Sequence, residues 1–145
     1  MDIERILVPV DFSKRSQVAV DMASALAKRW GASITLLHLN PTPPQLAPVA
    51  VEPVYIPPDV LRELRREHDK HLIAQLEQLK EQIPDGLQVS TRLQQGHPVH
   101  GILSHAVEHS IDLIVMSSHG RGMTRFLLGN VTERVTRRAP CPVMV

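Results

Sequence analysis

The sequence predicts an α/β fold built on a mainly parallel sheet. Short apolar runs typical of buried strands alternate along the chain with segments whose apolar residues recur at helical spacing. The order is strand, helix, strand, loop, helix, strand, helix, strand, helix, strand, and strands joined through helices run parallel in one sheet. We therefore expect five strands with helices on both faces, formed by a single domain of residues 1–145.

The first part of the chain supplies two strands and the helix between them. Residues 5–10 (RILVPV) and 32–40 (ASITLLHLN) are apolar enough for strands covered on both faces. A helix is expected from Ser13 or Arg15 to Trp30, and Gly31 is a natural stop. Its expected inward stripe consists of Val18, Ala19, Met22, Ala23, Leu26 and Trp30.

A proline-rich loop comes next. Residues 41–58 hold seven of the twelve prolines, which excludes a regular helix or a central strand. Asp59 is then expected to cap a helix that stops at residues 84–86 (Pro-Asp-Gly). The inward stripe expected for this helix is Leu61, Leu64, His68, Leu72, Leu76, Leu79 and Ile83.

The second half of the chain completes the sheet. Residues 87–96 alternate like a half-exposed strand, residues 98–109 have helical spacing, and residues 112–117 (DLIVMS) form the most apolar strand. A helix over about 130–138 and a final strand at 141–145 (CPVMV) follow.

Composition excludes several classes of protein. The net charge of +1 gives the whole chain no electrostatic preference for nucleic acid or an anionic membrane, and no apolar run is long enough to span a bilayer. The single cysteine, Cys141, excludes an internal disulfide framework and a cysteine-rich zinc site, and we expect it to be a buried, inert thiol. A cytoplasmic protein is expected.

Ligands of open parallel sheets bind beyond the carboxyl ends of the strands, where the winding direction reverses. The loop there that starts at Ser117 reads SSHGRGMTRFLLGN, in which His119-Gly120-Arg121-Gly122 lets backbone N–H groups approach an anion. Gly129-Asn130 then opens a helix whose N-terminus favours negative charge. Residues 117–145 hold five arginines and one acid, a local charge of +4. A tight turn, a helix capped by Asn130 and a solvated arginine face explain the same residues equally well.

Asp11 ends the first strand at the same edge of the sheet. Its carboxylate can accept hydrogen bonds from a base or a ribose, or it can cap a turn together with Ser13. The loop that contains it, PVDFSKRSQ, has no glycine and one carboxylate. These features exclude a P-loop, a GxGxxG dinucleotide fingerprint and a receiver-type acidic cluster.

The motifs together resemble those of the universal stress proteins, over nearly the whole chain except the proline-rich loop. The segments that carry the resemblance are ILVPVDFS, LLHL, GHP before a helix and DLIVM, and SSHGRGMTRFLLGNVTERVTRRAPCPVMV. The resemblance implies a flavodoxin-like (Rossmann-like) fold with strand order 3-2-1-4-5 and a homodimer joined through residues 141–145. It also implies a stress-response sensor or switch that binds ATP, with Mg²⁺ as the nucleotide's counter-ion, and acts on an unknown protein partner.

The resemblance also implies roles for individual residues. Asp11 and Leu39 would flank the adenine. The same pocket would be lined by Pro9, Val10 and Met116, and phosphate oxygens would be held by Asn130, Val131 and Thr132. Gly120 and Gly129 occupy the second and third glycine positions of the signature of ATP-binding members, which is Gly, two residues, Gly, nine residues, then Gly followed by Ser or Thr. His119 has a supporting role.

Three departures from that signature leave an alternative open. Ser117 replaces the first glycine, eight residues instead of nine separate Gly120 from Gly129, and Asn130 replaces Ser or Thr. Gly122 gives the shortened loop freedom to adjust. The alternative is an interaction protein of the same fold that has lost nucleotide binding, and a slow ATPase is a third hypothesis.

No other constellation predicts catalysis or metal binding. No Ser/His/Asp or Cys/His arrangement can be assembled, so an enzyme beyond slow ATP hydrolysis is not expected. His105 and His109 lie four residues apart on one helix, but no third ligand is identifiable. We expect this pair to face solvent.

Overall fold

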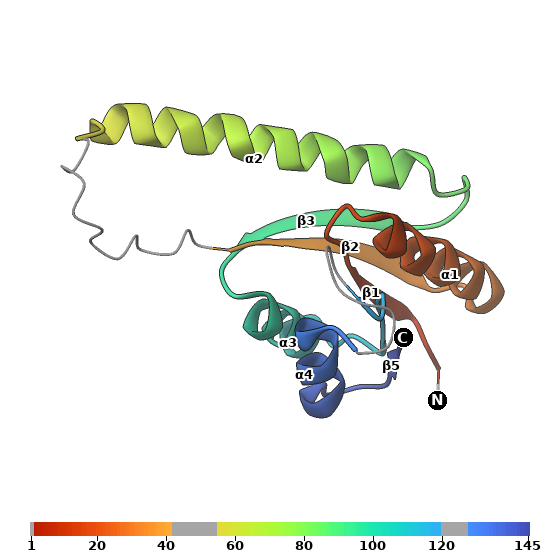
Figure 1. The fold of residues 1–145 in the computed structure, drawn as a ribbon. Helices are drawn as coiled ribbons and strands as arrows, with labels where there is room; N and C mark the ends of the chain where they lie inside the picture. The colour runs from red at the N-terminus through yellow and green to blue at the C-terminus, as the bar shows by residue number, and fades with distance from the viewer. Residues whose placement is uncertain (1, 42–54, 120–127) are drawn as a thin grey trace.

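The computed structural model describes residues 2–41, 55–119 and 128–145, and these form a five-stranded sheet in the order β3-β2-β1-β4-β5 (Figure 1). All four pairs of neighbouring strands are parallel, so the predicted fold class and strand order are confirmed. The strands are β1 (Arg5–Pro9), β2 (Ser33–Asn40), β3 (Val89–Gln95), β4 (Leu113–Val115) and β5 (Val143–Met144). The helices are α1 (Lys14–Trp30), α2 (Pro58–Glu81), α3 (Pro98–Glu108) and α4 (Asn130–Arg138). None of the described helices has the length and apolar character needed to cross a bilayer.

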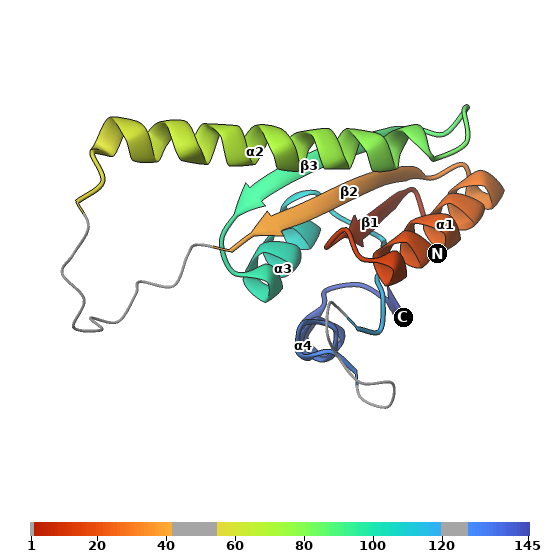
Figure 2. The same ribbon diagram turned by 45° about the horizontal axis from the view of Figure 1, so that its top comes forward.

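The sheet is covered on both faces, with α1 and α2 on one side and α3 and α4 on the other (Figures 1 and 2). Successive residues of β1 serve opposite faces: Ile6 and Val8 join the core beneath α1 and α2, whereas Leu7 joins the core beneath α3 and α4. All three side chains are fully buried. This two-sided burial explains why the strand is a continuous apolar run in the sequence.

Helix α1 has the predicted ends, but only part of the expected stripe, Ala19 and Ala23, lies on its buried face. Its N-cap Ser13 accepts a hydrogen bond from the Ser16 N–H (3.2 Å), and Gly31 ends it with a φ of 70°. Val18, Met22 and Trp30, which were expected to face inward, are exposed. The buried face is instead made of small side chains and one valine, which let the helix lie close to the sheet: Ser16, Ala19, Val20, Ala23, Ser24 and Ala27.

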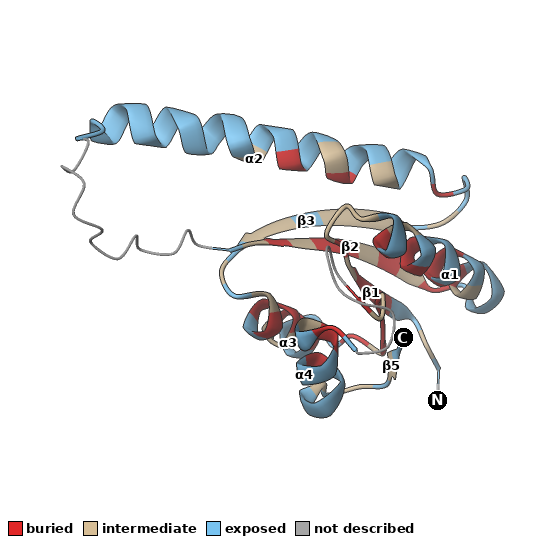
Figure 3. Cartoon of the chain, in the orientation of Figure 1, coloured by how far each residue is buried: buried red, intermediate tan, exposed pale blue. Residues whose placement is uncertain are grey.

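Helix α2 begins two residues earlier than predicted and packs over only part of its length. Pro57 is its N-cap and Pro58 its first residue, so Asp59 lies in the first turn and the prediction that it caps the helix is wrong. Proline suits this place because the first turn needs no N–H donor. Only Leu72 and Leu76 are buried within the helix. The expected stripe therefore fails in the N-terminal half, which is exposed and extends beyond the sheet (Figure 3).

The packing of α2 can be tested with two leucine substitutions. Leu76→Ala removes a buried side chain and should lower the free energy of unfolding by about 2–5 kcal/mol. Leu64→Ala makes the same chemical change at an exposed site and should shift it by less than about 0.5 kcal/mol. Urea denaturation followed by circular dichroism measures both values, and equal losses would contradict the partial packing of α2.

Candidate functional site

A cavity of about 310 Å³ opens at the carboxyl ends of β1, β2 and β4, beside the start of α4. The winding direction of the sheet reverses between β1 and β4, which is where ligands of such folds bind. Ten residues predicted for the site line this cavity: Pro9, Val10, Asp11, Leu39, Met116, Ser117, Gly129, Asn130, Val131 and Thr132. His119 is not among the lining residues, and Gly120 and Gly122 lie outside the described residues.

Four further lining residues were missed by the sequence analysis: Leu37, His38, Pro98 and Ile102. Two of them belong to α3, which packs against β2 and closes one wall of the cavity. Gly101 of the same helix faces Leu39 so closely that a Cβ atom built there would overlap the leucine side chain. Gly101 therefore sets the position of Leu39 in the cavity wall, although it is not itself a lining residue.

Asp11 fills one of the two roles that the sequence left open, the turn cap, and it also lines the cavity. Its Oδ1 accepts a hydrogen bond from the Ser13 N–H (3.0 Å), so it caps the turn that leads into α1. The Asp11 N–H in turn donates to Ser16 Oγ (3.2 Å). Phe12 between them has a φ of 62°, a conformation that non-glycine residues rarely adopt. The same aspartate lines the cavity, so the turn fixes the position of its carboxyl group.

The start of α4 is fastened to the end of β4. The Gly129 N–H donates to the Ser118 carbonyl (2.7 Å), and Thr132 Oγ1 donates to the Ser117 carbonyl (2.8 Å). Gly129 is the N-cap and makes no side-chain cap, and the helix covers Asn130–Arg138. The predicted range is therefore confirmed, and the alternative in which Asn130 caps the helix is not observed. The first N–H groups of a helix have no carbonyl partner within it. They lie here at the cavity edge, with no side-chain cap to satisfy them.

Ser117 and His119 shape the turn that follows β4. Ser117 Oγ donates to the His119 carbonyl (3.1 Å), and Ser118 Oγ lies 2.7 Å from His119 Nδ1. The His119 ring is buried, and its Nε2 has no hydrogen-bond partner among the described residues. The arginines of α4 that the structure describes (134, 137 and 138) are exposed and do not line the cavity.

The arrangement suits a ligand that is flat and apolar at one end and anionic at the other. Aliphatic side chains from β1, β2, β4 and α3 form most of the wall. The N-terminus of α4 attracts negative charge through its free N–H groups and its dipole. Apolar walls with a few well-placed polar groups are typical of small-molecule sites.

The other candidates have different surroundings from those expected. Cys141 is half-buried, and burial, with the nearby Asp112 carboxylate, raises the pKa of its thiol, which disfavours the nucleophilic thiolate. His105 is buried and its ring stacks on that of exposed His109, so the expectation of a solvent-facing pair is wrong for His105. The described residues contain no cluster of three or more His, Cys, Asp or Glu side chains suited to a metal ion.

Comparison with known proteins places the chain among relatives of one kind. The sequence model of the universal stress protein family matches residues 2–145. Universal stress protein YxiE of Bacillus subtilis (strain 168) is 34% identical over 143 residues, covering 97% of this chain and 97% of that protein. The structure of MJ0577, a universal stress protein of Methanocaldococcus jannaschii, aligns with a TM-score of 0.81 at 27% identity, over 100% of this chain and 96% of that one.

A universal stress protein solved in complex with cAMP also shares the fold, with a TM-score of 0.71 at 24% identity and coverage of 99% of this chain and 97% of that one. The match of the family model extends from Asp2 to the last residue, and the relative from Bacillus is similar along almost its full length. The chain therefore belongs to the universal stress protein family.

Proposed function

We propose that this protein binds an adenine nucleotide, ATP with Mg²⁺ as its counter-ion, in the cavity at the ends of β1, β2 and β4. The observation that carries the proposal is the meeting of apolar cavity walls with the N-terminus of α4, which has no side-chain cap. The base would lie between Asp11 and Leu39, and the phosphates at the N–H groups of Asn130, Val131 and Thr132. The family relative that was solved with cAMP supports the class of ligand.

The metal would be held by the nucleotide rather than by the protein. Asp11 is the one carboxylate among the described residues that line the cavity, and its Oδ1 already accepts the Ser13 N–H. Mg²⁺ keeps several waters and binds phosphate oxygens in such sites. The ion would neutralise the phosphates, and the chain's own contribution would be the helix N-terminus.

Nucleotide binding would make the protein a sensor or switch of the stress response in the cytoplasm. Occupancy would shift the population of conformations that a protein partner recognises. The second candidate function is an interaction protein that binds no nucleotide, and the replacement of the first signature glycine by Ser117 favours it. Slow ATP hydrolysis is a third candidate without an identifiable catalytic group.

Calorimetric titration with ATP and Mg²⁺ separates the first two candidates. We expect saturable binding, and we expect Gly101→Ala to weaken it about tenfold or more, because the new Cβ drives Leu39 into the base site. In a Leu39→Ala background the same substitution should have little further effect, since the overlap is gone. Val107→Ala, on the exposed face of the same helix, is the matched control and should bind as the parent does.

Two results would count against nucleotide binding at this site. A folded protein that shows no saturable binding at millimolar ATP leaves the interaction protein as the function. If Gly101→Ala lowers the affinity for ATP equally in the parent and in the Leu39→Ala background, the ligand lies elsewhere. A steady-state hydrolysis assay of the parent and of Asp11→Ala addresses the third candidate, which is dismissed if both stay at the background rate.

We further propose that the protein forms a homodimer through residues 141–145. Strand β5 lies at the edge of the sheet, where unpaired backbone groups invite pairing. Four exposed apolar side chains surround one hollow beside this edge: Val18 and Met22 of α1, and Met144 and Val145 at the end of the chain. An apolar patch next to an open strand edge is typical of an association surface.

Charge placed on this patch should separate the subunits. We expect Met144→Asp combined with Val18→Asp to convert a dimer into a monomer, as measured by light scattering after size exclusion. Val60→Asp introduces the same charge at an exposed apolar residue of α2 and should leave the dimer intact. A parent protein that is monomeric at about 0.1 mM, or a dimer that survives both charges, would rule out this interface.

A further inference from the structure

A second cavity, of about 410 Å³, lies at the opposite end of the sheet from the proposed nucleotide site. It is bounded by the amino-terminal parts of β1, β2 and β3 and by the C-terminal end of α3. Its walls are mostly polar, whereas the core between the sheet and α3 and α4 is apolar. The residues that carry the argument are Thr35, Ser90, Arg92, His105, Glu108 and His109.

The strand register explains how the polar side chains gather. Thr35 of β2 is paired with Ser90 of β3, and Leu37 with Arg92. Leu37 packs in the core beneath α3, so the alternation of the strands directs Thr35 to the same face. The hydroxyls of Thr35 and Ser90 lie 3.2 Å apart. This pair can donate a hydrogen bond into the cavity, because one hydroxyl proton satisfies their mutual contact and the other is free.

His105 of α3 is the buried imidazole in the wall of this cavity. It is 5% exposed and lines the cavity, and neither of its ring nitrogens has a hydrogen-bond partner among the described residues. Its ring stacks on that of His109 with centroids 3.9 Å apart and planes inclined by 13°. A ligand atom that enters the cavity can therefore form a hydrogen bond with this imidazole.

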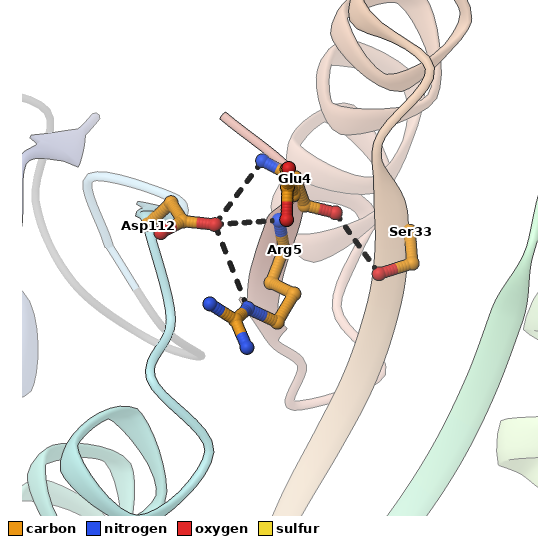
Figure 4. A network of polar contacts seen from close by, with 4 residues as sticks. All are labelled: Glu4, Arg5, Ser33 and Asp112. Carbon is orange, nitrogen blue, oxygen red and sulfur yellow. Dashed lines mark hydrogen bonds and ion pairs between the residues drawn. The ribbon is translucent and has the colours of Figure 1, made fainter. Parts of the chain in front are cut away.

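The charges around the cavity are unevenly compensated. Arg5 is held by Asp112, whose Oδ2 lies 3.6 Å from Arg5 Nε and accepts the backbone N–H groups of Glu4 and Arg5 (Figure 4). Ser33 donates to the Glu4 carbonyl in the same network. Arg5 and Ser33 are therefore already occupied at the rim.

Arg92 has no such partner. Its guanidinium donates to the Thr91 carbonyl (3.3 Å), and no carboxylate of the described residues forms an ion pair with it. Burial, followed by the positive charges of His109 and Arg92, lowers the pKa of His105, while Glu108 acts in the opposite direction. His109 and Arg92 thus act on the buried imidazole of His105 in the same direction, and an anion between them would oppose their effect.

We propose that this cavity binds a small molecule through an oxyanion, a phosphate or a carboxylate group, held between Arg92 and the imidazoles of His105 and His109. The planar guanidinium donates two parallel hydrogen bonds to such a group. The free hydroxyl proton of the Thr35–Ser90 pair donates a further one. Glu108 and the last carbonyls of α3 repel an anion here, which limits its affinity. Neutralising Glu108 should therefore strengthen anion binding, whereas neutralising Arg92 should weaken it.

The test uses two charge-neutralising variants that should change affinity in opposite directions. Sulfate keeps its charge across the pH range and stands for a phosphate group, and acetate stands for a carboxylate. Binding is followed by amide chemical shifts at constant ionic strength. Arg92→Gln should weaken sulfate binding about tenfold, and Glu108→Gln should strengthen it about threefold. Arg62→Gln, on α2 across the sheet, removes the same charge elsewhere and should change nothing.

The location and the protonation of the site give independent readouts. Saturating shifts should centre on Ser90, Arg92 and His105 and should persist when ATP fills the first cavity. The anion should raise the pKa of His105 from its lowered value. Its negative charge stabilises the charged imidazole and offsets the effect of Arg5, Arg92 and His109. Affinity should therefore increase as the pH falls toward that pKa. Of the nearby carboxylates, Glu108 lines the same cavity and Asp112 is paired with Arg5 at its rim.

Each outcome decides the proposal. Saturable shifts with both anions support a general oxyanion site, and shifts with only one of them assign the phosphate or the carboxylate. Shifts confined to Gly129 and Asn130 place the anion at the nucleotide site and overturn the proposal. Linear shifts without saturation, or equal effects of Arg92→Gln and Arg62→Gln, also overturn it. Loss of ATP binding alone leaves this inference untouched, because the two cavities share no lining residue.

Discussion

Two hydrogen bonds between the end of β4 and the start of α4 position the anion-attracting part of the proposed nucleotide site. Gly129 donates to the Ser118 carbonyl and Thr132 to the Ser117 carbonyl, and Thr132 is buried, so its hydroxyl requires that partner. The bonds hold the unpaired N–H groups of α4 at the edge of the apolar cavity. Without them the apolar walls would remain, but the anion-attracting helix end would have no fixed position against them.

Helix α3 connects this site to the second cavity. Pro98 and Ile102 line the first cavity, whereas His105 and His109 line the second. An 11-residue helix spans about 16 Å, so the two cavities lie at its two ends. The contact of Gly101 with Leu39, together with buried Ala106, determines how closely α3 packs on the sheet. Small residues at these positions let the helix approach the strands, and the same closeness buries the His105 ring.

The sequence predicted the order, direction and approximate ends of the elements because these follow from local periodicity, caps and chain connectivity. The predictions failed where contacts between residues distant in the sequence determine which side chains are buried. The inward face of α1 consists, apart from Val20, of alanines and serines, which hydrophobic periodicity ranks below Val18 and Met22. The N-terminal half of α2 keeps an apolar stripe although the sheet ends beneath it. The overlap of Gly101 with Leu39 and the burial of His105 depend on helix placement, which no local pattern encodes.

The departures from the signature of ATP-binding members differ in their structural consequences. The added hydroxyl at Ser117 has a local partner, the His119 carbonyl, so it stabilises the turn instead of lying unpaired in the cavity. Asn130 does not cap α4, because Gly129 occupies that place, and its side-chain amide, which has no hydrogen bond to the described residues, can donate to a phosphate oxygen. Both substitutions are thus compatible with an anion at the helix start.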